Sequence, residues 1–229
     1  MKRIGILGGT TAESSVEYYL RLTRESSRRL GEYAYPEIVL FSVTFRPFVE
    51  WMEAGDWRSL SAAVSDGVRV LADAGAGIGL LATNTFHRVF DEVAASAPIP
   101  MISLLDVVAE RLVGLGCGRA ALLGTRMTMD GTFYPNRLAK DGIETLVPEP
   151  EERASIHRII LEELGRGVVS GSSKRALLDV ARRLVGAGAD AVVLGCTELP
   201  LLVEADDLPV PVLDTTRLHA DAALEAAID

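Results

Sequence analysis

Several residue types are scarce in this chain, and each scarcity excludes a class of protein. Only two cysteines occur among 229 residues, in different contexts and without C-x-x-C spacing. The three histidines also lack metal-ligand spacing, so we expect neither a metal site nor a disulfide scaffold. Aromatic residues make up only 6% of the chain, so the core must consist mainly of aliphatic side chains.

Positive charge is also scarce. The three lysines (Lys2, Lys140 and Lys174) do not follow predicted strands, which argues against a Schiff base with pyridoxal phosphate, and we expect no cofactor. A formal net charge of −9 argues against a nucleic-acid-binding protein. An acidic chain can still form a locally positive pocket for a small anionic substrate.

Long hydrophobic runs are missing as well. No apolar run approaches the length needed to cross a bilayer, and the N-terminal residues lead directly into a strand-like run without a signal-peptide pattern. We therefore expect a cytoplasmic protein that does not bind membranes. With 48% hydrophobic residues and a mean hydropathy of +0.24, the chain can bury the core of one large or two small domains.

One segment of the chain occurs twice. Residues 74–85 read AGAGIGLLATNT and residues 187–198 read AGADAVVLGCTE, which places Thr83 opposite Cys196. Two further pairs recur at similar offsets, residues 3–10 with 119–126 and residues 98–103 with 209–214. These repeats predict an internal duplication.

Both halves alternate short apolar runs with longer helical patterns. Predicted strands cover residues 3–7, 38–43, 78–81, 102–104, 119–123, 144–147, 191–194 and 212–214, and predicted helices cover 13–30, 60–74, 87–95, 106–115, 133–140, 151–166, 172–187 and a segment from about 219. This alternation predicts an α/β fold with two pseudo-symmetric domains, each a mostly parallel sheet flanked by helices.

Two Pro-x-Pro segments suggest where the chain crosses between the domains, because proline stiffens an extended backbone. We therefore expect an N-terminal domain of residues 1–98 plus 210–229 and a C-terminal domain of residues 99–209. The active site is expected in the cleft between them, at the carboxyl ends of strands.

Polar groups follow the first and third predicted strands of the first half. Gly8-Gly9-Thr10-Thr11 suits an anion site, although a plain turn capped by threonine explains it too. The segment lacks the third glycine of a dinucleotide fingerprint and the lysine of a P-loop. The segment Thr83-Asn84-Thr85-Phe86-His87 favours a cleft site over simple helix capping.

The second half has matching positions. Cys196, in Cys196-Thr197-Glu198, is a candidate acid/base or nucleophile, although cysteine is also common as a small buried hydrophobe. Thr125 and Thr128 flank Arg126 in a loop that matches the first anion loop. Arg46 follows the second predicted strand, as a ligand or a solvated loop residue, and Arg28-Arg29 is expected on a solvated helix face.

Together these motifs resemble one known family over nearly the full chain. GGTTAESS, ATNTFH, LLGTRMTM, LGCTELP and DTTRLH, in this order, are similar to the aspartate/glutamate racemase family. The resemblance implies two pseudo-symmetric α/β domains, usually a homodimer, and cofactor-independent racemisation of aspartate or glutamate. In that family a cysteine from each domain flanks Cα, and each transfers a proton on its own face.

The chain departs from this pattern at one catalytic position. Thr83 replaces the first cysteine, as in the subgroup typified by the L-aspartate/glutamate-specific racemase, and Cys196 is the second. Threonine is a far weaker acid than cysteine, so a preference for one substrate hand is expected. Carboxylate-binding candidates are Asn84, Thr85, Thr125 and Thr197, with Thr10, Thr11, Arg46 and Thr128 for the side-chain carboxylate.

Two other functions remain open on the sequence. A single thiol also fits a carbon-acid enzyme similar to the arylmalonate decarboxylases, which keep one cysteine as a proton donor. The missing cysteine also fits an amino-acid binder without catalysis, although Cys196 and the hydroxyl-rich loops argue against that reading.

Overall fold

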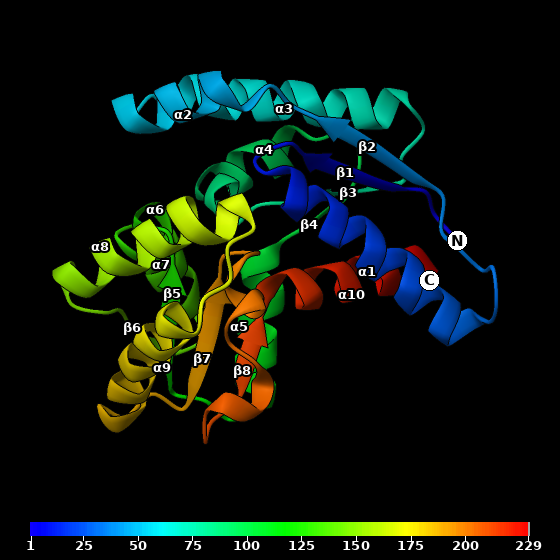
Figure 1. The fold of residues 1–229 in the computed structure, drawn as a ribbon. Coiled ribbons are helices and arrows are strands. Elements are labelled where there is room, and N and C mark those ends of the chain that lie inside the picture. The colour runs from blue at the N-terminus through cyan, green and yellow to red at the C-terminus, as the bar shows by residue number, and fades with distance from the viewer. Residues whose placement is uncertain (229) are drawn as a thin grey trace. The chain divides into compact units, whose positions relative to one another are not determined.

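The computed structural model describes residues 1–228, which form two compact units. Unit 1 comprises residues 1–104 together with the chain from His219 onward, and unit 2 comprises Leu105–Leu218. Each unit contains one four-stranded parallel sheet with helices packed around it (Figure 1). The expected fold class, two α/β domains with parallel sheets, is confirmed.

The sheet of unit 1 has the strand order β2-β1-β3-β4. Its strands are β1 (Ile4–Gly8), β2 (Ile38–Ser42), β3 (Ile78–Leu81) and β4 (Met101–Ile102), and its helices are α1 (Ala12–Leu30), α2 (Phe45–Ala54), α3 (Trp57–Asp73), a 3-10 turn (Thr85–Val89) and α4 (Phe90–Ser96). β1 and β3 are adjacent and buried along their whole length, so their carboxyl ends lie side by side at one edge.

The sheet of unit 2 repeats this topology as β6-β5-β7-β8. Its strands are β5 (Arg119–Gly124), β6 (Glu144–Leu146), β7 (Ala191–Gly195) and β8 (Val212–Asp214), and its helices are α5 (Leu104–Gly114), α6 (Arg126–Met129), α7 (Phe133–Ala139), α8 (Pro150–Arg158) and α9 (Gly171–Gly186), with a π turn (Ile159–Glu163) and 3-10 turns (Leu164–Arg166, Leu199–Leu201, Ala205–Asp207). β5 and β7 correspond to β1 and β3.

The last helix, α10 (Thr215–Ile228), begins four residues before the expected start at about 219. From His219 onward it belongs to unit 1, where Ala220, Ala223 and Leu224 join the core with Tyr18 and Leu22 of α1. The alanines let the two helices approach closely. In residues 1–228 no helix is both long and apolar enough to cross a membrane.

The units divide at different places from those expected. β4 pairs with β3 in unit 1, and β8 pairs with β7 in unit 2. Each Pro-x-Pro segment therefore leads into the last strand of its own sheet, and the chain leaves that sheet afterwards. The compact units end at Leu104 and Leu218, whereas the expected boundaries were 98 and 209.

A second difference concerns the segment after β2. The sequence suggested a loop around Arg46, but the structure has helix α2. Pro47 lies in the first turn, where no backbone N–H is needed, so it does not break the helix. Phe48 and Met52, four residues apart, bury the inner face.

Candidate functional site

The polar groups of unit 2 follow the two central strands. Gly124 of β5 and Gly195 of β7 pair across the sheet, so Thr125 and Cys196 leave it at the same edge. A Cβ at Gly195 would lie 3.0 Å from Thr128 Cγ2, and one at Gly124 would meet Thr128 Cβ at 3.0 Å. The two glycines therefore let Thr128 pack directly over the strand ends.

Cys196 is partly exposed at this edge. Its thiol donates a hydrogen bond to Glu198 Oε2 at 2.8 Å, and the Thr197 hydroxyl donates to the same oxygen at 2.7 Å. Burial raises the pKa of the Cys196 thiol well above its ordinary value, and the negative charge of Glu198 and its hydrogen bond raise it further. The group is therefore a protonated thiol at neutral pH.

Two threonines complete the unit 2 edge. The hydroxyls of Thr125 and Thr128 lie 3.3 Å apart; Thr128 is buried, whereas Thr125 is partly exposed. Arg126 is exposed and pairs with Asp130 at 3.4 Å. The structure thus brings Thr125, Thr128, Cys196 and Thr197 to one sheet edge and leaves Arg126 in solvent.

In unit 1 the loop after β1 is a tight turn that ends in a helix cap. Gly9 has φ 96°, and a Cβ there would lie 2.5 Å from the backbone N of Val43, so only glycine fits. The Gly9 N–H donates to Ser15 Oγ at 2.9 Å. The Thr11 hydroxyl accepts from the Ser14 N–H at 3.1 Å and caps α1. The capping role of Thr11 is therefore established by its contacts.

Thr83 occupies the position in unit 1 that Cys196 has in unit 2. It follows β3 and is partly exposed. The residue before it, Ala82, is joined to the first turn of α1, because Ser14 Oγ donates a hydrogen bond to the Ala82 carbonyl at 2.6 Å. Asn84 is buried, and Thr85 begins the 3-10 turn. Thr10, Thr11, Thr83 and Thr85 thus follow adjacent strand ends in one unit.

Arg46 follows β2, and so belongs to a different strand end from these threonines. It is the second residue of α2 and is exposed, and among residues 1–228 no hydrogen bond joins it to the threonines of unit 1. The structure therefore does not link its guanidinium to the other candidates.

The two histidines near these motifs are structural. His87 Nδ1 lies 2.9 Å from the Thr83 carbonyl, and His87 Nε2 accepts the Leu104 N–H at 3.0 Å. Nδ1 therefore carries the proton. His219 Nε2 faces the Ile102 carbonyl at 2.8 Å, so its Nδ1 accepts from the Tyr18 hydroxyl at 2.8 Å. Burial lowers the pKa of His87 to about 3 and that of His219 to about 4, so both rings are neutral.

Glu198 was named in a motif but was not among the predicted site residues, although it is a carboxylate two residues after the candidate cysteine. Ser14 and Ser15 were not predicted either, although they follow the capping Thr11 closely and contact the turn and the β3 end. Cys117, the second thiol, is free, buried and precedes β5, at the opposite end of that sheet from Cys196.

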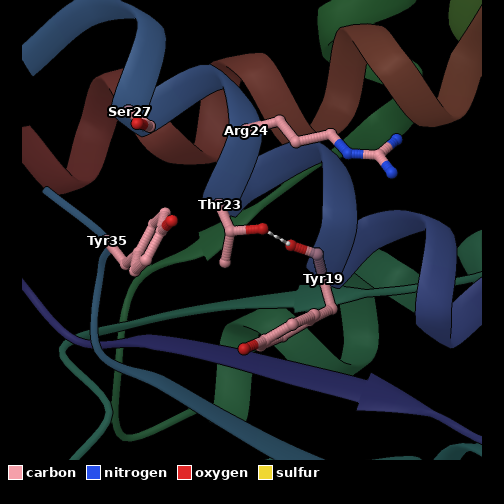
Figure 2. Close-up of a pocket in the computed structure, with 5 residues that line it drawn as sticks. All are labelled: Tyr19, Thr23, Arg24, Ser27 and Tyr35. Carbon is pink, nitrogen blue, oxygen red and sulfur yellow. Dashed lines mark hydrogen bonds between the residues drawn. The ribbon is translucent and has the colours of Figure 1, made fainter. Parts of the chain in front are cut away.

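Two hollows are lined by residues other than the candidates. One, of about 470 Å³, is on the outer side of α1 and is lined by Tyr19, Thr23, Arg24, Ser27 and Tyr35 (Figure 2). Another, of about 520 Å³, lies beside β8 and includes Arg111, Leu213 and Arg217. Neither contains a residue that the sequence proposed for the site. Within residues 1–228, no three His, Cys, Asp or Glu side chains gather closely enough to hold a metal ion.

Comparison with known proteins identifies the fold. The structure of a putative Asp/Glu racemase from Yersinia pestis is 37% identical and superposes with a TM-score of 0.93 over 100% of both chains. That of an aspartate racemase homologue from Pyrococcus horikoshii OT3 is 36% identical, with a TM-score of 0.89 over 100% of both chains. The broad specificity amino-acid racemase RacX of Bacillus subtilis (strain 168) is 21% identical over 96% of each chain.

The model of the family described as Asp/Glu/Hydantoin racemase matches residues 7–223, a range that includes all the candidate site residues. With two relatives above 35% identity over their full length, this match shows that the chain belongs to the Asp/Glu/hydantoin racemase family of isomerases.

Proposed function

We propose that the protein racemises aspartate or glutamate without a cofactor, with Cys196 and Thr83 transferring the Cα proton on opposite faces of the substrate. One observation carries this proposal: each residue follows the third strand of its sheet, at the corresponding place in two units of the same topology. A partly exposed thiol and a partly exposed hydroxyl at these places are the available proton-transfer groups.

The surrounding hydroxyls and amides supply what the reaction demands. An α-proton is weakly acidic, so the negative charge that develops on the substrate carboxylate must be stabilised by hydrogen bonds. In this proposal Asn84, Thr85, Thr125 and Thr197 bind the α-carboxylate, and Thr10, Thr11, Arg46 and Thr128 serve the side-chain carboxylate. Removal of one such donor typically raises the barrier by about 3 kcal/mol.

The relatives support an amino-acid substrate. Two are described as a putative Asp/Glu racemase and an aspartate racemase homologue, and a third as a racemase of broad specificity. We extend the acidic substrate class to this chain, together with the homodimer that the family resemblance implies and the cytoplasmic location expected from the sequence.

The first test is solvent exchange at Cα. The pure protein is incubated in deuterium oxide with L- or D-aspartate and L- or D-glutamate, without cofactor, and α-proton loss is followed by NMR. Chiral chromatography reports the handedness of the product. We expect exchange with inversion, fastest from the L side.

The matched variant is Cys196→Ala. It should reduce exchange by at least 100-fold, because it removes the principal acid/base group. Cys117→Ala removes the other thiol, which lies at the far end of β5, and should retain exchange. Full activity in Cys196→Ala would overturn the assignment of the thiol.

A second candidate follows from the single thiol. Because Thr83 is a poor proton donor and acceptor, the chain also suits a carbon-acid enzyme that works on one face only, similar to the arylmalonate decarboxylases. Exchange without inversion, or turnover of a disubstituted malonate with no exchange of amino acids, would favour this candidate. Binding of an amino acid without any exchange would indicate a noncatalytic binder.

A further inference from the structure

Glu198 is a buried carboxylate without a positive partner. Glu198 is 4% exposed, and no lysine, arginine or histidine pairs with it in the described part of the chain. One carboxylate oxygen, Oε1, is buried and has no hydrogen-bond partner among those residues. Burying a charge and an unmatched acceptor costs free energy, so a carboxylate kept in this state calls for a functional explanation.

The other oxygen contacts the thiol. Glu198 Oε2 accepts from Cys196 Sγ at 2.8 Å and from Thr197 Oγ1 at 2.7 Å. The backbone that carries Glu198 is held in place on its C-terminal side, because Leu199, Leu202 and Val203 are part of the unit 2 core. The short distance to sulfur therefore follows from a rigid turn.

Glu198 is also the charged group whose field acts on this thiol. The neighbouring side chains from β5 and α6 are the neutral hydroxyls of Thr125 and Thr128. Hydrogen bonds from the backbone N–H groups of Glu198 and Thr197 lower the pKa of the thiol, against the effect of burial and of the carboxylate. These N–H groups are placed to stabilise a thiolate once the proton has left.

We infer that Glu198 is a positioning residue that holds the Cys196 thiol in place and accepts its proton when the thiolate is needed. The inference rests on the proposed function for the use of that thiolate. In this step the S–H bond breaks, its electron pair stays on sulfur, and a new O–H bond forms at Glu198 Oε2. The negative charge moves from oxygen to sulfur, so no additional charge is created in the buried region.

This arrangement has a measurable consequence. While the pair retains a single proton, the thiolate fraction is set by the internal transfer and does not follow solvent pH. In Glu198→Gln the amide oxygen can still accept a hydrogen bond from the thiol, but it does not take up the proton. The thiolate then forms by loss of the proton to solvent and increases about tenfold per pH unit below the pKa of the thiol.

The test is alkylation of the unmodified full-length protein by iodoacetamide, without substrate, between pH 6 and 8. Mass spectrometry of the peptide that contains Cys196 separates its rate from that of Cys117. We expect less than a twofold change across this range in the wild type and about a tenfold rise per pH unit in Glu198→Gln. Asp206→Asn, which removes an exposed acid of the same unit, should behave as the wild type.

A tenfold rise per pH unit in the wild type would overturn the inference, and this result needs no variant to fold. A flat profile in Glu198→Gln would overturn it as well. Deuterium exchange at Cα should show the same contrast in slope if the proposed function holds.

The two proposals fail separately. A flat wild-type alkylation profile with no exchange of any amino acid would reject the racemase and keep the Cys196–Glu198 pair. Exchange with inversion together with a steep alkylation profile would keep the racemase and reject the role of Glu198.

Discussion

At the scale of single residues, the chemical difference between two corresponding positions decides the behaviour expected of the protein. Cys196 and Thr83 both follow the third strand of a sheet, but a thiol loses its proton several pH units more readily than an alcohol. The local contacts differ as well: Cys196 donates to a carboxylate, whereas the Thr83 carbonyl faces a histidine nitrogen. A one-handed preference would follow from this asymmetry.

Substitution of Thr83 tests that asymmetry. Thr83→Val removes the hydroxyl with little change of shape, and we expect inversion to fall at least 100-fold while Cα exchange from the cysteine face persists. Thr83→Ser keeps a hydroxyl and should retain inversion within about tenfold. Deuterium incorporation and chiral chromatography on the same samples separate the two effects. Wild-type inversion in Thr83→Val would exclude Thr83 from the proton transfer.

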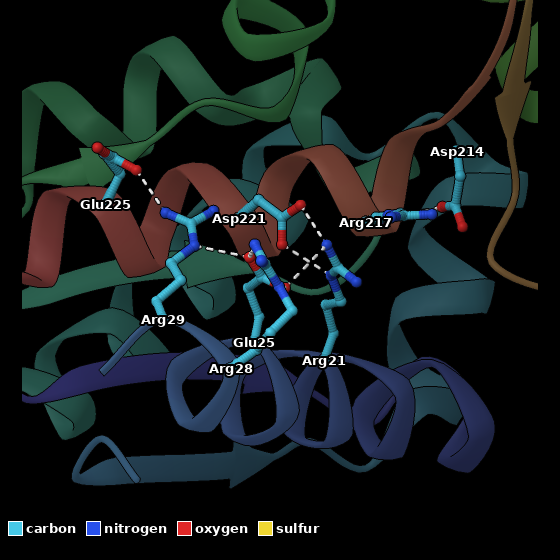
Figure 3. A network of polar contacts seen from close by, with 8 residues as sticks. All are labelled: Arg21, Glu25, Arg28, Arg29, Asp214, Arg217, Asp221 and Glu225. Carbon is cyan, nitrogen blue, oxygen red and sulfur yellow. Dashed lines mark hydrogen bonds and ion pairs between the residues drawn. The ribbon is translucent and has the colours of Figure 1, made fainter. Parts of the chain in front are cut away.

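At the scale of elements, α1 and α10 are joined by a charged network as well as by apolar packing (Figure 3). Glu25 is 5% exposed and accepts hydrogen bonds from Arg28 and Arg29, and Arg29 also pairs with Glu225 of α10. Arg21 makes a two-point contact with Asp221. Arg28 and Arg29 are exposed, as expected, and each also binds the buried carboxylate of Glu25.

This network gives an element-level prediction. Hydrogen bonds from Arg28 and then Arg29 hold the pKa of Glu25 down to about 2, so its charge persists at all ordinary pH values. Glu25→Gln should lower the free energy of unfolding by about 2 kcal/mol, because charge-assisted hydrogen bonds in a buried site are lost. Denaturant titration at pH 7.5 measures it.

Asp66→Asn is the matched control for Glu25→Gln. Asp66 pairs with Arg69 on an exposed helix surface, and such pairs contribute little, so a change below about 0.5 kcal/mol is expected. Equal effects of the two substitutions would show that burial adds nothing to the Glu25 network.

At the scale of the whole molecule, unit 1 contains two buried histidines that the fold keeps neutral. Both have a pKa far below the ordinary value of about 6.5. Below pH 6.5 the unfolded chain therefore binds protons that the folded chain does not. The contribution of the two neutral histidines to the free energy of unfolding is therefore full above pH 6.5 and is lost as the pH falls toward 4.

We therefore expect the free energy of unfolding to fall by about 4 kcal/mol between pH 7.5 and pH 5, about 2 kcal/mol for each histidine, before most carboxylates titrate. Denaturant titrations at several pH values measure this slope. In His219→Gln the slope near pH 5 should correspond to about one fewer proton taken up on unfolding, even if the variant is less stable at every pH. A slope that is the same in both proteins would mean that His219 is not held neutral.

The sequence by itself determined the class of fold and the positions of the strand ends. Alternation of short apolar runs with helical patterns depends on local periodicity, which one chain displays directly, and the repeat that pairs Thr83 with Cys196 needs no coordinates. The motifs also identified the family. Local signals were less useful at two helix starts. Pro47 in the first turn concealed α2, and the Asp214 carboxylate, which accepts a hydrogen bond from the Arg217 N–H, lies just before the start of α10 at Thr215.

Only the tertiary structure decided how distant groups are paired. The strand that each Pro-x-Pro segment enters is set by hydrogen bonds between strands far apart in sequence, so β8 belongs to unit 2. The neutrality of His87 and His219 and the burial of Glu25 depend on packing against segments up to about 200 residues away. The contact of Glu198 with the Cys196 thiol depends on how the turn after β7 is anchored in the core, because sequence spacing does not specify where a side chain points.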